Sequence, residues 1–307
     1  MSRLVLGVML VAATAAAQVP ATAETQPILS TGVGDVAIVP NHTSPEQSLV
    51  AGVDTLQVGL YVFGLDGGAA QPALQLGPAR GVSAKTGLAG AASTVVLVGS
   101  ANLGTSIHGL ADSGVLTPIG KRLISGASVM AMWVTPSGAL EAWLDTGGAT
   151  LLRVALVSDS AAPGMVDWAA LDASVTFPRP ITAVAIDEAN RRLYATSLDG
   201  ISGWTIDGPS GPDVLELVDG GGLGGVSAGL ALYPLRDGGA LLLAAVPSRE
   251  DIAVYRAVGT GLELVGRFSV TIGARQVRNV EFIDVTQAAL PGFPRGMVVL
   301  SDRNATT

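Results

Sequence analysis

Short apolar runs separated by turn-forming residues recur along the whole chain. They are rich in β-branched or aromatic types and end at turn signals such as Asp66-Gly67, Asp199-Gly200 and Asp237-Gly238. The clearest runs are Gly59–Phe63, Thr94–Val98, Leu151–Val157, Ala240–Ala245, Ile252–Tyr255 and Gly296–Leu300. Many short strands at regular spacing are typical of a sandwich, a barrel or a propeller. No later stretch has the apolar period of an amphipathic helix, so the pattern predicts an all-β chain.

The first 23 residues have the pattern of a secretory signal peptide. Arg3 supplies a positive start, Leu4–Ala17 is apolar or small, and small residues follow up to Ala23. The apolar run is shorter than the ~20 residues that a membrane-spanning helix needs, and no later segment could span a membrane. We therefore expect cleavage near Ala17 or Ala23 and a secreted or periplasmic protein whose domain covers residues 24–307.

A weak repeat supports a propeller. A strand with Tyr or Trp between other strand residues recurs at Leu60–Val62, Leu193–Ala195, Gly203–Thr205 and Val254–Arg256. The 284 residues after the leader (307 − 23) correspond to about six blades of roughly 40–50 residues each. Because no linker, charge run or low-complexity tract divides these residues, we expect one domain.

Composition excludes several classes of function. Only 14% of the residues are charged and the formal net charge is −8, so the chain lacks the basic surface that binds nucleic acid. The same charge disfavours a polyanionic substrate unless a cation assists. The absence of cysteine excludes a disulfide framework, a thiolate nucleophile and a cysteine zinc site, and two distant histidines, His42 and His108, make no zinc site either.

Other site patterns are weak. No nucleophile elbow supports a Ser-His-Asp triad. The glycine-rich run Gly220–Gly225 has no following Lys, so it is expected to be a flexible blade connection and not a phosphate loop. The aromatic residues are too scattered to form a base-stacking surface.

Three parts of the chain, taken together and in order, resemble one family. They are Val36–Asp54 with Gly59–Gly67, then Val184–Tyr194, then a series of matches between Gly229 and Asn304. The sequence is similar there to the β-propeller phytases. The resemblance implies a six-bladed β-propeller. It also implies a calcium-dependent 3-phytase, a phosphoric monoester hydrolase that removes phosphate from phytate (myo-inositol hexakisphosphate).

The residues that such chemistry needs are largely replaced. Calcium takes about six to eight oxygen ligands, and bound metal ions can activate water and hold substrate oxygens. Where the family has acids this chain has Ile181, Leu198 and Ala228, and where it has two lysines this chain has Leu56 and Gln57. The alternative to a phytase is therefore a non-catalytic propeller. It would act as a binding or accessory module for a ligand, a protein partner or another propeller domain.

Some oxygen ligands remain as weak metal candidates. Glu281 replaces an acid of the ligand type, and Asp284 and Asp302 lie next to turns, where capping a loop is the simpler interpretation. The full set of remaining acceptors is Asp35, Asp187, Glu188, Asp199, Glu281, Asp284, Asp302 and Asn304. The metal candidates among them are Asp35, Glu281, Asp284 and Asp302.

Two other positions have simple structural interpretations. Asp187 and Glu188 are expected to form a hairpin turn. Arg80 aligns loosely with a phosphate-facing arginine of the family, but it is expected to be an ordinary surface residue.

The C-terminus ends sooner than the resemblance implies. After Ser301–Asn304 the family continues with a segment that supplies the closing strand, whereas here three residues follow. The expected propeller is either incomplete at its C-terminus or closed in another way.

Overall fold

The structure is a computed structural model that describes residues 3–7, 17–25, 33–56, 59–87, 94–120, 126–160, 162, 164–206, 214–219, 227–258 and 261–302. These residues form mostly antiparallel β-sheets joined by turns, with one short 3-10 helix, η1 (Pro45–Gln47). The chain divides into two compact units. The first unit combines Met1–Leu29 with Arg179–Thr307, and the second is Ser30–Pro178.

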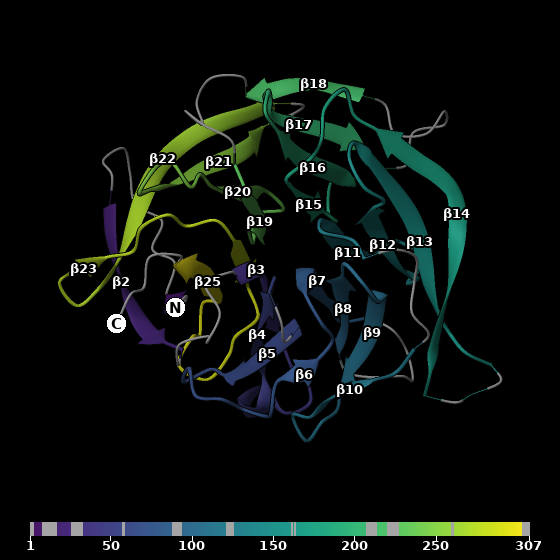
Figure 1. Cartoon of the computed structure of the whole chain (residues 1–307). Helices are drawn as coiled ribbons and strands as arrows, with labels where there is room; N and C mark the ends of the chain where they lie inside the picture. Colours follow the sequence, from purple (N-terminus) through teal and green to yellow (C-terminus); the bar gives the residue numbers. More distant parts are fainter. Residues whose placement is uncertain are drawn as a thin grey trace. The chain divides into compact units, whose positions relative to one another are not determined.

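The unit Ser30–Pro178 contains three sheets of four strands, each an antiparallel meander of consecutive strands (Figure 1). The first sheet is β3 (Val33–Val39), β4 (Leu49–Asp54), β5 (Gly59–Gly64) and β6 (Leu74–Gln75). The second is β7 (Ala79–Lys85), β8 (Thr94–Ser100), β9 (Gly104–Leu110) and β10 (Leu116–Pro118). The third is β11 (Met130–Val134), β12 (Leu140–Asp145), β13 (Thr150–Ser158) and β14 (Val166–Thr176).

The other unit contains one four-stranded and one nine-stranded sheet. The four-stranded sheet is β15 (Ala183–Asp187), β16 (Arg192–Ser197), β17 (Gly200–Thr205) and β18 (Val214–Asp219). The nine-stranded sheet includes β19 (Gly229–Pro234), β20 (Ala240–Ala245), β21 (Ile252–Val258), β22 (Gly261–Ile272) and β23 (Arg275–Gln276). It continues through β2 (Ala17–Glu24), β1 (Arg3–Gly7), β25 (Met297–Asp302) and β24 (Ile283–Thr286).

The expected count of six sheets is corrected by the hydrogen bonding, which gives five. The reason is β2, which pairs with β1 on one side and, in parallel, with β22 on the other. One continuous sheet therefore replaces two separate ones. The all-β architecture of repeated four-stranded meanders is that of a β-propeller.

The core of each unit lies between neighbouring sheets. In Ser30–Pro178, one apolar cluster joins β3–β5 to β7–β10, and a second joins β8 and β9 to β11–β14. In the other unit, one cluster joins β15–β17 to β19–β22, and another joins the β19–β22 strands to β24 and β25. All seven residues of β8 are buried, which explains its continuous apolar run.

Two glycines allow a strand to lie close to the backbone of a neighbouring segment. A Cβ atom at Gly99 would overlap the Ala127 carbonyl oxygen, and one at Gly229 would lie 2.5 Å from the Glu281 carbonyl oxygen. Any side chain at either position would have to displace backbone.

The strand and turn predictions are confirmed. The six apolar runs lie in or at the start of β5, β8, β13, β20, β21 and β25. At two of the predicted turns, Asp66 and Asp237 each accept a backbone N–H two residues ahead at 3.0 Å, and the intervening glycines have φ of 85° and 84°. No helix of the described residues is long and apolar enough to cross a membrane.

Candidate functional site

A polar residue recurs where the second strand of a sheet ends. In Ser30–Pro178 these residues are Asp54, Ser100 and Asp145, at the ends of β4, β8 and β12, and all are buried. Ser100 donates its hydroxyl hydrogen to the Leu76 carbonyl oxygen at 2.9 Å. Because buried polar atoms require partners, these strand ends are the first place to look for a site.

The two buried aspartates are held by nearby donors. Asp54 Oδ1 accepts the Leu56 amide at 2.8 Å. Asp145 Oδ1 accepts the Gly147 amide at 2.7 Å, and its Oδ2 accepts the Ser128 hydroxyl at 2.8 Å. Both carboxylates therefore stabilise strand ends.

Asp35, one of the predicted metal candidates, uses both carboxylate oxygens in the same way. Its Oδ1 accepts the Val36 amide at 2.8 Å, and its Oδ2 accepts the Val82 amide at 3.0 Å. The second contact joins β3 to β7. The side chain is therefore a link between the first strands of two sheets.

In the other unit, hydroxyl groups lie at or beside the matching strand ends. The hydroxyl oxygens of Thr196, at the end of β16, and Thr182 are 2.9 Å apart. At the end of β20 the residue is Ala245, whose carbonyl oxygen accepts the Ser227 hydroxyl at 3.0 Å. At the end of the Met297–Asp302 strand, Ser301 Oγ accepts a backbone amide at 3.0 Å. These contacts tie strands together without a carboxylate.

The other predicted metal candidates lie in and beside β24 and β25. Glu281 precedes β24 and is half-buried. Asp284 lies on β24 and accepts the Val285 amide at 2.8 Å, while Asp302 ends β25. Over the part of the chain that the structure describes, no three His, Cys, Asp or Glu side chains gather as they would around a metal ion. Asn304 lies outside the described residues.

The three positions where the family has acids have different surroundings. Ile181 is buried, Leu198 is 64% exposed and Ala228 is half-buried. A carboxylate at Leu198 would meet water, whereas one at Ile181 would have to enter the core.

Two further predictions are confirmed. Asp187 ends β15 and accepts both the amide and the side-chain N–H of Asn190, at 3.1 and 2.8 Å, which closes the predicted hairpin turn before β16. Arg80 is an exposed residue of β7. His42 lies exposed in a loop, and the glycine-rich run 220–225 lies outside the described residues.

His108 is buried on β9 and forms a pair with Ser106. Its Nε2 lies 2.8 Å from Ser106 Oγ. The Ser106 hydroxyl also lies 3.3 Å from the Val98 carbonyl oxygen on β8. Both residues of the pair lie on β9, and the histidine tautomer sets the direction of the hydrogen bond between them.

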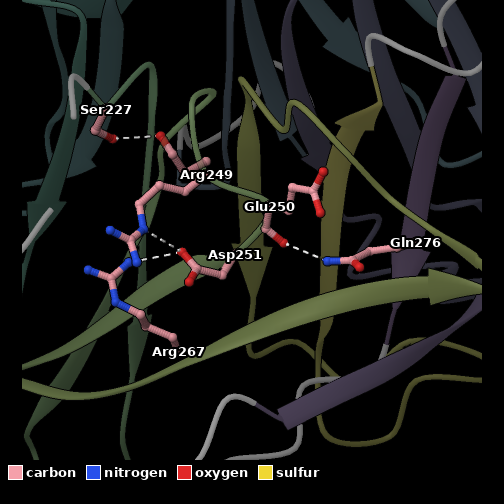
Figure 2. Close-up of polar contacts among 7 residues, drawn as sticks. Ser227, Arg249, Glu250, Asp251, Arg267 and Gln276 are labelled. Carbon is pink, nitrogen blue, oxygen red and sulfur yellow. Dashed lines mark hydrogen bonds and ion pairs between the residues drawn. The ribbon is translucent and has the colours of Figure 1, made fainter. Parts of the chain in front are cut away.

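Arginines and acids gather around the turn between β20 and β21 (Figure 2). Arg249 Nε and an Arg267 terminal nitrogen both donate to Asp251 Oδ1, at 3.2 and 2.9 Å. Next to them, Arg278 pairs with Glu250 at 3.1 Å. We call these five residues the arginine cluster. With three cations and two anions, the cluster holds the turn against β22 and has a small excess of positive charge.

A buried cluster on β11, β12 and β13 was not predicted. The Arg153 guanidinium lies 5.6 Å from the Trp133 ring centroid and 5.8 Å from that of Trp143, a cation–π arrangement. Glu141 Oε2 accepts Arg153 Nε at 2.7 Å and Trp133 Nε1 at 3.0 Å. The strand register that creates it pairs Trp133 with Glu141 and Trp143 with Arg153. The alternation of side chains between the two faces of each strand was the available signal in the sequence. It reveals this cluster only when the strand register is known.

Two tyrosines have perturbed acidity. Burial raises the pKa of Tyr194 above its usual 10.0. Burial also raises the pKa of Tyr61, and the nearby Asp54 carboxylate adds to the effect. Both phenols therefore stay protonated at neutral pH.

The chain matches no family model and no curated protein. Among solved structures, it is similar to a functionally unknown protein from Desulfotomaculum acetoxidans DSM 771, with 13% identity, a TM-score of 0.52, and 80% of this chain and 75% of that chain covered. It is also similar to BBS1N in a complex with ARL6DN, with 10% identity, a TM-score of 0.53, and 94% and 84% of the two chains covered.

These likenesses and the sheet meanders together show a β-propeller fold. At such low identity they show the fold alone. They give no support to the phytase family in particular.

Proposed function

We propose that this chain is a non-catalytic β-propeller that acts as a binding module for a protein partner. The observation that carries the proposal is that Asp35 and Asp145 accept hydrogen bonds from within the fold. Asp35 and Asp145 each direct both carboxylate oxygens at a backbone amide or a hydroxyl. Oxygen atoms engaged in this way hold strands in place.

The same observation argues against the phytase alternative. A calcium ion would have to compete with these short hydrogen bonds for carboxylate oxygens, and it needs about six to eight oxygen ligands. If calcium displaced these N–H and O–H donors, the strands that they hold in place would loosen.

A protein partner is the class of ligand that the comparisons favour. BBS1N, whose structure resembles this chain, was solved in a complex with ARL6DN. A propeller without a catalytic centre offers sheet edges and loops as binding surfaces. The arginine cluster is mostly neutralised by its own acids, so we place the main contact elsewhere.

The nine-stranded sheet contains two groups of antiparallel strands. The strands β19–β22 are antiparallel neighbours, and so are β24, β25, β1 and β2. A parallel pair, β2 with β22, joins the two groups. The Ser301 amide bonds the Phe282 carbonyl oxygen at 3.0 Å, which matches the bond from the Asp145 amide to Val129 at 2.9 Å. The β24–β25 pair therefore repeats the pattern of the other blades.

We propose that the chain is exported, because its first residues have the pattern of a secretory leader. The pairing of β2 then affects where the leader could be cleaved. Cleavage after Ala23 would remove β1 and most of β2, whereas cleavage after Ala17 would remove β1 but keep β2 apart from Ala17. Val19 on β2 is buried in the core, and Glu24 pairs with Arg275 at 2.9 Å. We therefore favour cleavage after Ala17.

The proposal is tested by phosphate release from phytate, measured on the purified chain with and without added calcium. The variant Asp35→Asn is the matched control, because it keeps the size of the side chain but removes its charge. We expect equal background release from both proteins. Calcium-dependent release that is lost in Asp35→Asn would contradict a non-catalytic role.

A further inference from the structure

Strand β1 lies between two other strands and joins them. On one side it pairs antiparallel with β25, where Val5 lies opposite Leu300 and Gly7 opposite Val298. On the other side it pairs antiparallel with β2, which in turn runs parallel to β22 (Figure 1). β1 therefore connects the β24–β25 pair to the rest of the nine-stranded sheet.

This connecting strand lies inside the proposed leader. Cleavage after Ala17 removes the whole of β1 but leaves β2 from Gln18 onward. The place between β25 and β2 that β1 fills in the full chain, which we call the β1 slot, would then be open in the exported chain.

The backbone groups that line the β1 slot on the side of β25 can be identified. The Ser301 amide bonds the Phe282 carbonyl oxygen at 3.0 Å, toward β24, and therefore points away from β1. In an antiparallel ladder the direction alternates with each residue. The ladders on both sides of β25 run without a break over the residues before Ser301. The amide and carbonyl groups of Leu300 and Val298 consequently point toward β1.

Removing β1 would uncover part of the core. With β1 in place, Val298 is 4% exposed and Leu300 is 1% exposed. Both side chains belong to the apolar cluster that also contains Val19 on β2 and Ile283 on β24. Buried backbone groups need hydrogen-bond partners, and burial of apolar area is favourable. A new strand in the β1 slot would restore both, so the open slot favours binding.

The neighbours of the slot also define the segment that fits it. Directly opposite residues of an antiparallel pair share one face of the sheet, so the residue opposite Leu300 must be apolar. Val299 and Ser301, which point to the other face, are buried as well. Strands buried on both faces are continuous apolar runs. The occupant is therefore an extended, uncharged apolar segment, and Leu4–Leu6 is the example in this chain.

A second copy of the chain is the weaker choice of occupant. Over the part of the chain that the structure describes, every named strand is already paired within its own sheet. A second copy would have to break such pairing to supply a strand. An extended segment of another protein loses no pairing of this kind.

We propose that leader cleavage opens the β1 slot, and that the slot binds an extended apolar segment of a partner protein as a replacement for β1. Recognition through an added strand obtains its affinity from main-chain hydrogen bonds. The inference rests on the proposed cleavage after Ala17 and on the proposed function, and it names the surface through which the module binds.

The test compares the exported form, which begins at Gln18, with the full chain. The probe is a fluorescein-labelled peptide with the sequence of residues 2–8, which represents the partner segment. Fluorescence anisotropy should show saturable binding to the exported form. Binding to the full chain should be weaker by about tenfold or more, because β1 already fills the slot there.

Two altered peptides test whether main-chain pairing holds the probe. A Val5→Pro peptide has no N–H opposite Leu300 and should bind the exported form about tenfold more weakly or worse. The matched control Val5→Ile keeps the N–H and a β-branched side chain, and should bind like the original peptide.

Hydrogen exchange locates the bound peptide. The Val298 and Leu300 amides should exchange faster in the exported form than in the full chain, and should slow again when the peptide is added. The amides of Val299 and Ser301 point toward β24 and serve as internal controls, so the peptide should change their exchange less.

A full-chain variant keeps the test decisive if the exported form does not fold alone. Val5→Pro in the full chain is directed at the pairing of β1 with β25 and should increase peptide binding over that of the unmodified chain. An exported form that folds only when the peptide is added, measured by circular dichroism, would also support the slot. One that stays unfolded with the peptide would contradict it.

Three further results would overturn the inference. They are equal peptide binding by the exported form and the full chain, slow exchange of the Val298 and Leu300 amides in the exported form without peptide, and a dimer in sedimentation velocity that the peptide dissociates. The last result would assign the slot to a second copy.

The proposals on which the inference rests fail by other measurements. N-terminal sequencing that finds Met1 or Glu24 would refute the cleavage, whereas peptide binding is measured on a chain made to begin at Gln18. Phosphate release from phytate would refute the non-catalytic role and leave the peptide result standing.

Discussion

Replacing Asp145 with alanine tests whether the strand-end acids are structural. Asp145 is 7% exposed, and its carboxylate accepts the Ser128 hydroxyl at 2.8 Å and the Gly147 amide at 2.7 Å. A hydrogen bond to a charged group contributes about 1.5–3 kcal/mol, and the variant loses two. Relief from burying the charge offsets part of this loss, so we expect Asp145→Ala to lower the free energy of unfolding by about 3 kcal/mol.

The measurement is urea unfolding followed by tryptophan fluorescence, with Asp237→Ala as the control. Asp237 also accepts a backbone amide, at 3.0 Å, but it lies exposed at a turn. Asp237→Ala should lower the free energy of unfolding by less than about 1 kcal/mol, because water replaces the contact. The loss of stability in Asp145→Asn should lie between those of Asp145→Ala and Asp237→Ala, since the asparagine amide group can still form hydrogen bonds with Ser128 and Gly147. Equal costs for Asp145→Ala and Asp237→Ala would refute the reasoning.

Four other outcomes are expected. Glu141→Gln should cost about 3 kcal/mol in urea unfolding and shift the tryptophan emission, because it leaves the half-buried Arg153 guanidinium without its counter-charge. Arg267→Ala should lower the free energy of unfolding more than Arg249→Ala, because the Arg267 side chain is 16% exposed and that of Arg249 is 40% exposed. The loss for Arg249→Ala should stay below about 1 kcal/mol. Because burial raises the pKa of Tyr194, the contribution of this phenol to stability should be constant below its usual pKa of 10.0 and fall above it, where the unfolded chain loses the proton first. Tyr194→Phe should lose this part of the decline in urea midpoints. N-terminal sequencing of the exported protein should begin at Gln18, and a start at Glu24 would contradict the role given to β2.

The strands were predictable because local signals define them. Thr94–Val98 is a continuous run of β-branched and apolar residues, and it lies in a strand whose residues are all buried. The turn at Asp66-Gly67 follows from a side chain that accepts the amide of Gly68 and a glycine with positive φ.

The joining of two groups of strands into one sheet was not predictable. It depends on pairing of Ala17–Pro20 with Phe268–Thr271, some 250 residues away (268 − 17 = 251). The apolar leader and a strand of small residues have similar local patterns, so sequence alone could not distinguish the two.

The candidate site was predictable only where contacts are local. Asp187 and Asn190 are three residues apart, and their turn was expected. Asp35 was expected to be a metal candidate. Its contact with the Val82 amide could not be predicted, because it joins residues 47 positions apart and depends on how two sheets pack. Arg153 was not singled out, because its place between two indoles depends on the register of three strands.

Calorimetric titration of the purified chain with calcium chloride tests the central claim most directly. The account predicts no tight binding and no rise in the unfolding temperature, because the carboxylate oxygens of Asp35 and Asp145 already accept amide and hydroxyl hydrogens. Tight binding at several sites, accompanied by phosphate release from phytate, would contradict it.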